Sequence, residues 1–476
     1  MLFLLVLFPL AVAALALLIP WDRWRPLVLP FLGMGHLILT LLVLVVPEGF
    51  DSGWVGLDAV GRLAILCISG LFFFCSIYAV GYLRYWKQRP NRIFTACFSG
   101  LLGLLSLVVL SRHLGLLWVA IEGSTLVSAP LIYFNHNKLS IEATWKYLLI
   151  GSVGIALALL GTFFLAYSAL SGGMAATLSF DELIRGAPGL SKTWLRAAFI
   201  LLLVGYGTKM GLAPMHSWKP DAYGESPGVV GALFAGGITT AAFLALVRVY
   251  QICQAAGETA FVSLLLLIMG ALSMAVAGLF LIGQKDLKRM LAYSSVEHMG
   301  ILVLGLGIGK TAFFGTLLHV VNNTATKGVL FLSAGNIQRA FGSKSIDVVR
   351  GAFRRLPVSG ALFLAGFLAI TGSPPFAPFV SEFAILKGSL DAGNFFVAGL
   401  FLVLLLVVFI GMGSTVLKAV QGRFPQGVGD PSYRDGFLSA APAIGLMALV
   451  LLLGVVLPPP LRQLVDDAVH ALEGQP

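Results

Sequence analysis

The chain has 476 residues, of which 58% are hydrophobic and only 11% are charged. Soluble domains carry about 25% charged residues, so a chain this poor in charge cannot cover the roughly three soluble domains that its length would allow. Composition therefore excludes a cytosolic enzyme, a disordered chain and a nucleic-acid-binding protein. The formal net charge of +10 is instead typical of basic cytoplasmic loops, and the fold class that we predict is an all-α polytopic membrane protein.

The apolar segments, taken in chain order, define the expected membrane helices. A transmembrane helix needs about 20 mostly apolar residues, and the first such segment lacks the basic start of a signal peptide, so a helix is expected there. The sequence predicts about fourteen segments, at residues 1–19, 26–46, 59–82, 92–111, 115–134, 144–170, 196–216, 227–250, 261–283, 290–308, 312–338, 357–388, 394–420 and 437–457. Sizeable loops are expected only at 171–195, 339–356 and 421–436, so no soluble domain is predicted.

The basic residues between these segments predict how the chain is oriented in the membrane. When alternate loops are assigned to opposite sides, 18 basic residues, Lys219 and Arg423 among them, fall on one side and 6 on the other. Because basic loops stay in the cytoplasm, this split places both termini on the outer side, which is the periplasm in a Gram-negative bacterium. A wrong number of helices would mix the basic residues of the two sides, so their uneven distribution also supports the predicted number of helices.

Cofactor and metal motifs are not found in the sequence. The four cysteines lie in or beside apolar segments without a paired Cys-x-x-Cys spacing or a histidine–cysteine cluster, which argues against disulfides, iron–sulfur clusters and zinc. The glycines form neither a phosphate-binding loop nor a dinucleotide-binding fingerprint. No linear spacing typical of a metal site or a catalytic triad is present, so we expect no cofactor and no metal in this chain.

Glu122 is the first of several ionisable residues inside apolar segments, where burying a charge costs on the order of 3 kcal/mol. It lies in LLWVAIEGSTLVSAP, close to Ser124, Thr125 and Ser128. Acids in such positions are expected to be functional. The alternative is a Glu that pairs with a lysine only to hold two helices together. Both interpretations require a buried lysine, and Lys209 is the candidate.

Lys209 lies in LVGYGTKMGLAPMHSWKPDAYGESP, which its glycines and Pro214 are expected to break near the middle of the membrane. Broken helices at this depth are tolerated where they line a cavity or pack inside protein. A buried lysine beside a carboxylate at variable distance can take up and release a proton. The alternative, a lysine that extends to the membrane surface, is disfavoured because Lys209 lies well inside its segment.

The segment LAITGSPPFAPFVSEFAIL contains a second expected break. Pro374, Pro375 and Pro378 interrupt an apolar helix, and Glu382 follows directly. Two interrupted helices in corresponding positions of two halves indicate an ion path in transporters that are built from inverted repeats.

Between the two breaks, LLHVVNNTATKGVLFL places His319, Asn323 and Lys327 at positions i, i+4 and i+8 of one helix. This spacing predicts a polar stripe on one helix face, along which waters could carry protons, and histidine is suited to such a relay. The neighbouring Glu297 and His298 could extend this line toward the first break. The alternative is a hydrogen-bonded packing seam, since membrane helices also use amides and hydroxyls in that way.

Three long motifs support a family resemblance. They are LWVAIEGSTLVSAPLIYFNHNKLSIEATWKYLLIGSVGIALALLGTFFL, GYGTKMGLAPMHSWKPDA and DLKRMLAYSSVEHMG. The chain resembles the antiporter-like proton-pumping subunits that respiratory complex I, membrane-bound hydrogenases and Mrp-type antiporters share, and it is most similar to hydrogenase-4 component F. The resemblance covers about residues 60–420.

The resemblance implies a division of the chain and a place for it in a larger assembly. Three N-terminal helices at 1–91 would precede two inverted five-helix repeats, a proton-input half at 92–250 and a proton-output half at 261–420, and a last helix with a short tail would occupy 421–476. Each repeat would contain one broken helix. The chain would lie in a bacterial or archaeal cell membrane beside other membrane and hydrophilic subunits, which would carry iron–sulfur clusters and a nickel–iron, flavin or quinone site.

The resemblance also assigns roles to residues. Glu122 matches the family's glutamate, paired with Lys209 in the broken helix. Lys327 matches the central lysine, His319 its histidine, and Glu382 the distal group, which is Lys in some members and Glu in others.

One segment departs from the family pattern. In several relatives, the helix that corresponds to 227–250 carries a Lys or His that links the first lysine to the centre, whereas this chain offers threonines such as Thr239. Either the link between Lys209 and Lys327 uses hydroxyls, water or His298, or this member pumps by a different route.

The function that we predict is proton translocation through a Lys/Glu/His axis, without a redox centre in this chain, coupled to electron transfer in partner subunits. One rival is an Mrp-type Na⁺/H⁺ antiporter subunit. A second is a structural membrane anchor whose polar axis no longer works, and a quinone-reducing enzyme is a weaker third.

Overall fold

The structure is a computed structural model that describes residues 1–45, 53–422 and 433–474. Over these ranges the regular secondary structure is helical, apart from three isolated β-bridges between loop residues. Arg423, one of the basic residues in the orientation argument, lies outside the described residues, as does most of the expected loop 421–436.

The first half of the chain contains the elements α1 (Leu2–Leu18), α2 (Val28–Val45), α3 (Ala59–Tyr85), α4 (Arg92–Leu110), α5 (Leu114–Ile132), α6 (Lys138–Ser171), α7 (Phe180–Arg185), α8 (Lys192–Met210), α9 (Trp218–Glu225), α10 (Gly228–Leu233), the π-helical turn η4 (Phe234–Ile238) and α11 (Thr239–Ala255). The second half contains α12 (Thr259–Leu281), α13 (Leu287–Ile308), α14 (Lys310–Phe341), α15 (Ala352–Arg355), α16 (Pro357–Ile370), α17 (Ala377–Asp391), α18 (Phe395–Gln421), α19 (Phe437–Val455) and α20 (Pro459–Glu473).

Each of the fourteen predicted segments corresponds to a helix or a group of consecutive helices. Ten helices in the described part of the chain are long and apolar enough to cross a membrane, and α1 and α16 are shorter apolar helices. The all-helical membrane fold is therefore confirmed. Two of the predicted segments, those of α8 and α14, fall outside the ten because their polar residues lower the mean hydropathy, and some of these residues, such as Lys209 and Lys327, belong to the site described below.

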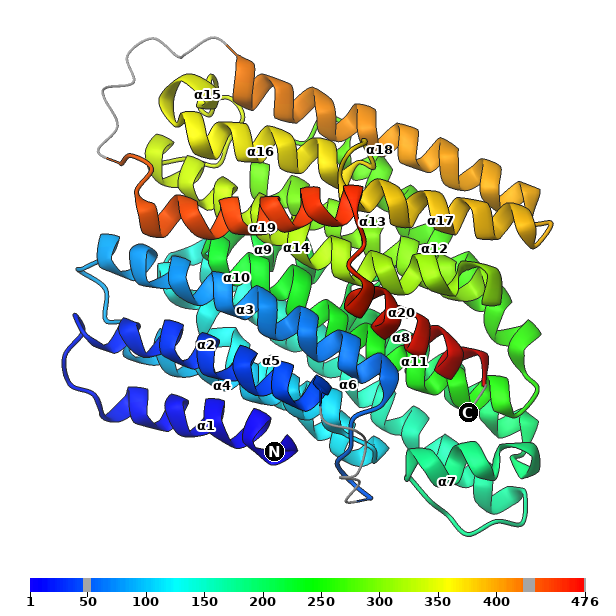
Figure 1. Ribbon diagram of the computed structural model, residues 1–476. Coiled ribbons are helices and arrows are strands. Elements are labelled where there is room, and N and C mark those ends of the chain that lie inside the picture. The colour runs from blue at the N-terminus through cyan, green and yellow to red at the C-terminus, as the bar shows by residue number, and fades with distance from the viewer. Residues whose placement is uncertain (46–52, 423–432, 475–476) are drawn as a thin grey trace.

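Figure 1 shows the helices packed side by side with their axes in similar directions, so that their ends gather at two opposite faces. Both chain ends lie toward the face that carries α7, whereas the short helix α15 lies at the opposite face. The predicted segment 227–250 is one continuous rod of α10, η4 and α11, and it is buried among the other helices. This segment is therefore an interior element of the bundle.

Helix α14 is the central element of the second half. It packs against α13, α16, α17 and α19 and also against α10 of the first half. Its 32 residues make it about 48 Å long at a rise of about 1.5 Å per residue, more than the ~30 Å hydrocarbon core requires. Nearly all of its side chains are buried, so its polar residues face other helices.

The C-terminal helix α20 is an element that the sequence analysis treated as a short tail. Its apolar residues Val465, Ala468 and Leu472 are spaced on one face and buried, and the helix packs against α3 and α14. Gln251 Nε2 also donates a hydrogen bond to the carbonyl of Ala471, 3.1 Å away. The segment was missed because a helix that is apolar on one face only has a low mean hydropathy.

Candidate functional site

The first helix break, at residues 211–217, separates α8 from α9. Gly211 has φ = +78°, which is strained for residues with a side chain but available to glycine. A helix end leaves carbonyl groups without partners, and two side chains from beyond the break satisfy two of them here. Trp218 Nε1 donates to the carbonyl of Thr208 at 2.9 Å, and Lys219 Nζ donates to that of Met210 at 2.6 Å.

Lys209 is buried one residue before the end of α8. Its Nζ donates hydrogen bonds to Thr125 Oγ1 at 2.7 Å and to Tyr147 OH at 2.8 Å, and it lies 4.9 Å from the centre of the Tyr147 ring. The Tyr147 hydroxyl is also hydrogen bonded to Ser128 Oγ at 2.7 Å. Helices α5 and α6 therefore supply a hydroxyl-lined pocket for the ammonium group of Lys209.

Glu122 lies on α5 one turn before Thr125. One of its carboxylate oxygens accepts a hydrogen bond from Ser152 Oγ at 2.9 Å, and the other is buried without a partner. Glu122 and Lys209 are both described, and no direct ion pair joins them in this structure. The charge of Glu122 still acts on Lys209.

Lys219 is placed differently from the expectation. From its position between predicted segments, Lys219 was expected to lie in a cytoplasmic loop, but its side chain is fully buried. Besides the carbonyl of Met210, its Nζ reaches the carbonyl of Ser295 on α13 at 3.3 Å, and it lies 5.6 Å from the ring centre of Tyr223. The expectation was wrong because the chain beyond the break continues inside the protein as α9 before it reaches the surface.

Helices α13 and α14 bring the central residues together. Lys327 Nζ donates to Ser294 Oγ at 2.7 Å, and His298 Nδ1 lies 2.9 Å from His319 Nε2. Ser294 and His298 are one turn apart on α13, while Lys327 and His319 are two turns apart on α14. All four side chains are buried, so the predicted stripe on α14 faces a matching polar row on α13.

The auxiliary residues of the sequence analysis lie around this row. Glu297 and Asn323 are buried, and each has an oxygen without a hydrogen-bond partner. Thr239 donates its hydroxyl proton to the carbonyl of Ala235 in its own helix at 2.7 Å. Its hydroxyl is therefore already engaged, and the structure places Lys219, rather than Thr239, in contact with both the first break and α13.

The second break, at residues 371–376, separates α16 from α17, and Glu382 follows on the second turn of α17. Gly372 in this break has φ = +67°, and a Cβ atom there would lie 2.2 Å from Glu382 Oε2. The first break has the same arrangement, since a Cβ atom on Gly211 would lie 2.5 Å from Lys219 Cδ. In each break a glycine thus leaves room for the charged side chain that follows it.

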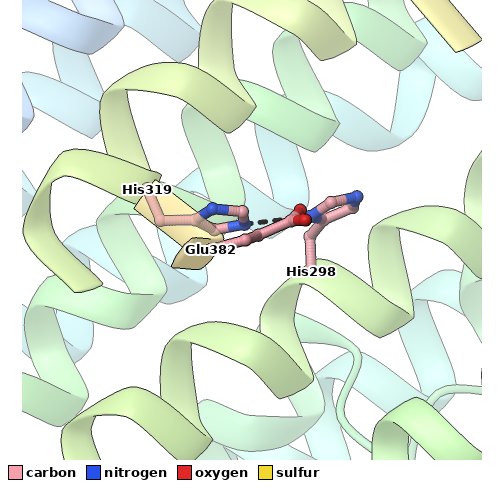
Figure 2. A group of neighbouring side chains, drawn as sticks. All are labelled: His298, His319 and Glu382. Carbon is pink, nitrogen blue, oxygen red and sulfur yellow. Dashed lines mark hydrogen bonds between the residues drawn. The ribbon is translucent and has the colours of Figure 1, made fainter. Parts of the chain in front are cut away.

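Glu382 meets the two histidines between α13, α14 and α17. One oxygen of Glu382 and one nitrogen each of His298 and His319 all lie within 4.8 Å of one another. Figure 2 shows the two imidazole rings meeting with the carboxylate beside them. His319 Nδ1 also lies 2.9 Å from Ser381 Oγ. Linear spacing could not reveal this cluster because its members come from three different helices.

A separate polar cluster fixes the end of the bundle at which α3 begins. Asp58 Oδ2 lies 3.0 Å from Arg112 Nη1 and 3.2 Å from Arg248 Nη2. Burial raises the pKa of Asp58, but the charges of Arg248 and Arg112 and the amide of Gly61 together bring the pKa below its usual value. Asp58 is therefore held as a carboxylate that anchors α3 to α11.

The structure combines two broken helices with a series of buried lysine, histidine and glutamate side chains next to them. This combination defines the class of antiporter-like membrane subunits. The comparisons with known proteins agree. The profile described as NADH:quinone oxidoreductase/Mrp antiporter, TM matches residues 111–409, which is more than half of the chain. The chain belongs to this family, and the resemblance found in its sequence is confirmed.

Three similar proteins show the range of this family. The hydrogenase-4 component F homolog of Methylacidiphilum infernorum is 35% identical over 373 residues, which cover 77% of each chain. NADH-quinone oxidoreductase subunit N of Desulforudis audaxviator is 31% identical over 401 residues, 81% of this chain and 77% of the relative. A chain of the Mrp complex from Dietzia sp. DQ12-45-1b matches with a TM-score of 0.87 and 20% identity over 99% of this chain and 97% of its own, which shows the shared fold.

Proposed function

We propose that this chain translocates protons as a subunit of a membrane-bound oxidoreductase of the hydrogenase-4 or NADH-quinone oxidoreductase type. The observation that carries the proposal is the series of buried titratable side chains from Glu122 to Glu382 across both breaks. Its buried members are Lys209, Lys219, Glu297, Lys327, His298, His319 and Glu382, and it begins at Glu122, a partly buried residue with one enclosed carboxylate oxygen. Buried ionisable groups inside membrane helices are costly, so a series of them favours a function over a structural anchor.

The proton would move through this series in response to charge. A change of charge in a neighbouring subunit would alter the interaction between Glu122 and Lys209, and Lys209 would then release its proton toward Lys219 and Lys327. Two unit charges 4 Å apart interact by about 4 kcal/mol at an effective dielectric constant of 20. This energy is large enough for the approach or separation of one carboxylate to decide whether Lys209 keeps its proton.

The second half would carry the proton onward and release it. From Lys327 the path would pass through the histidines to Glu382 and then to the outer side. We propose residues 92–250 as the input half and 261–420 as the output half, after a three-helix segment at 1–91 and before the C-terminal segment 421–476. Both termini would face the periplasm, which the basic residues Arg354 and Arg355 of α15 support because α15 lies at the face opposite the termini.

The partners of this chain would contain the redox chemistry. Relatives in the family are named as components of hydrogenases and NADH-quinone oxidoreductases. We therefore propose membrane and hydrophilic partner subunits with iron–sulfur clusters and a nickel–iron, flavin or quinone site. This chain would contribute the ion path alone.

The test is Lys209→Ala in the intact complex, reconstituted into sealed vesicles. Proton translocation driven by the complex's own redox reaction is followed with a pH-sensitive dye, and assembly is checked by native gel electrophoresis. We expect coupled translocation to be abolished while the complex still assembles. Lys192→Ala is the matched control, because Lys192 begins the same helix with its side chain 62% exposed.

Two results would count against the proposal. If coupled translocation survives in Lys209→Ala, this lysine does not take part in the mechanism and the proposed path through it is wrong. A pH gradient that depends on added Na⁺ and forms without redox substrate would instead favour the Na⁺/H⁺ antiporter.

A further inference from the structure

We propose that His298, His319 and Glu382 form a binding site for a divalent transition-metal cation of the Zn²⁺ type. The three donor atoms lie within 4.8 Å of one another and come from α13, α14 and α17. Two imidazole nitrogens and one carboxylate oxygen are the donor set of zinc sites that keep a fourth position open for water. All three side chains are at least 95% buried, so no competing ligand from bulk water surrounds them.

The hydrogen bonds around His319 leave its inner nitrogen free to bind a metal. Ser381 Oγ donates its proton to the carbonyl of Pro378 at 3.0 Å, so this oxygen accepts from its other neighbours. His319 Nδ1, 2.9 Å away, is therefore the donor to Ser381, and its Nε2 carries a lone pair in the neutral ring. That lone pair is directed at His298 and Glu382, as Figure 2 shows.

His298 has a comparable arrangement. Its Nδ1 faces His319 at 2.9 Å, while its Nε2 lies 3.7 Å from Glu297 Oε2 and has no hydrogen-bond partner. Because His319 Nε2 carries a lone pair, His298 Nδ1 is the donor in this contact when no metal is bound. Metal binding would require the proton of His298 to lie on Nε2, which faces Glu297 Oε2, so that Nδ1 offers the second lone pair. Metal-binding histidines usually direct their outer N–H at a carboxylate or another acceptor in this way.

Glu382 supplies the third ligand and part of the charge balance. Its Oε1 is buried without a hydrogen-bond partner, which is unusual for a buried acceptor and is resolved if the oxygen binds a cation. Glu297 lies close enough to interact with Glu382 electrostatically, so a second acidic side chain lies near the site. Gly372 keeps the space beside Glu382 open, because a Cβ there would lie 2.2 Å from its Oε2.

The distances require only small movements on binding. Zinc bonds of about 2.1 Å in tetrahedral geometry place the donor atoms about 3.4 Å apart. The two histidine nitrogens, now 2.9 Å apart, would separate by about half an ångström, and the carboxylate would close in by rotation of its side chain. A bound cation would engage the groups proposed to carry the proton to the outer side, so we expect it to inhibit translocation. This inhibition rests on the proposed function, whereas the binding does not.

The binding experiment uses the full chain in nanodiscs, treated with a chelator and then titrated with ZnCl₂ in competition with a chromophoric chelator. We expect one tightly bound zinc per chain, and at least tenfold weaker binding in His298→Gln, His319→Gln and Glu382→Gln. Ser381→Ala removes an outer partner of a ligand and should weaken binding by about tenfold or more. His216→Gln is the control, because His216 lies in the first break and outside the cluster, and it should bind zinc as the wild type does.

A second measurement covers variants that fail to fold. Cobalt(II) added to the wild-type chain should produce visible ligand-field absorption of a four-coordinate site with nitrogen ligands, which zinc displaces. The proposal is overturned if the wild type binds no stoichiometric zinc and shows no such cobalt spectrum, or if any of the three ligand variants folds and keeps wild-type affinity. In vesicles, zinc binding without loss of proton translocation would leave the site standing and contradict the proposed path through these residues.

Discussion

Lys219→Met removes a buried cation that lies between the first lysine of the path and the centre. In the structure its Nζ donates to the carbonyls of Met210 at 2.6 Å and Ser295 at 3.3 Å. Lys209, beside the first carbonyl, belongs to the proposed path, and Ser294, beside the second, accepts the hydrogen bond from Lys327 of the same path. Methionine has a similar length and no charge, so the substitution tests the ammonium group and largely preserves the packing.

The size of the effect follows from the two contacts. Hydrogen bonds that involve a charged group contribute about 1.5–3 kcal/mol each, and the second contact is long, so a total near 3 kcal/mol is expected. If Lys219 only holds the break together, this energy is lost from the stability of the fold. If a proton passes through it, a barrier raised by about 3 kcal/mol slows translocation by about 100-fold.

A matched control separates the two outcomes. Lys288 is also a buried lysine that donates to a backbone carbonyl, that of Ser226 at 2.5 Å, but it lies at the start of α13 and away from the path. Translocation per assembled complex is measured in vesicles, and stability by thermal unfolding in detergent. We expect both Lys219→Met and Lys288→Met to lose stability, and Lys219→Met alone to lose translocation. If translocation per complex in Lys219→Met stays within about threefold of the wild type, Lys219 has no part in the path.

Two further substitutions test other parts of the structure. Asp58→Asn leaves the buried Arg248 without its carboxylate partner and should destabilise the protein by about 3–5 kcal/mol at pH 7. The pKa of Asp58 in the folded state is lowered. Its stabilising effect is therefore present above the unfolded-state pKa near 3.9 and is lost as the pH falls through the lower folded-state pKa. Thermal unfolding should therefore show the difference between wild type and Asp58→Asn shrinking below about pH 4, and a constant difference would contradict the ion-pair explanation. Thr239→Val should leave translocation unchanged, because its hydroxyl is bonded to its own helix; a large loss in the vesicle assay would restore Thr239 as the link.

The membrane helices and most of the buried charges could be predicted from the sequence. A charge inside an apolar segment is conspicuous because everything around it lacks charge, so Glu122, Lys209, Lys327 and Glu382 could be found without a structure. The structure shows that Lys209, Lys327 and Glu382 are buried and that Glu122 is partly buried. Their roles stay a prediction until the substitutions above are tested.

Lys219 could not be recognised in the same way, for a physical reason. It follows a stretch rich in glycine and proline and precedes Pro220 and Asp221, a composition that is typical of a surface loop. The break itself was expected from the glycines and Pro214, but only the fold shows that the chain beyond it continues in the interior as α9. The contact between His298 and His319 was equally hidden, because it depends on which faces of α13 and α14 meet.

In each half of the chain, a buried lysine lies near a carboxylate without a direct ion pair, and this arrangement affects how a proton can move. Lys209 interacts electrostatically with Glu122, and Lys327 with Glu297, yet both lysines donate their hydrogen bonds to hydroxyl groups. A lysine in direct contact with a carboxylate would hold its proton strongly, because the Coulomb energy of the pair grows as the distance shortens. Because neither lysine is paired directly with its carboxylate, the interaction is weak enough for the proton to leave and strong enough for a movement of the carboxylate to control when it does. A lysine bonded directly to its glutamate in both halves would be a poor carrier, whereas here the ammonium groups are bonded to the hydroxyls of Thr125, Tyr147 and Ser294.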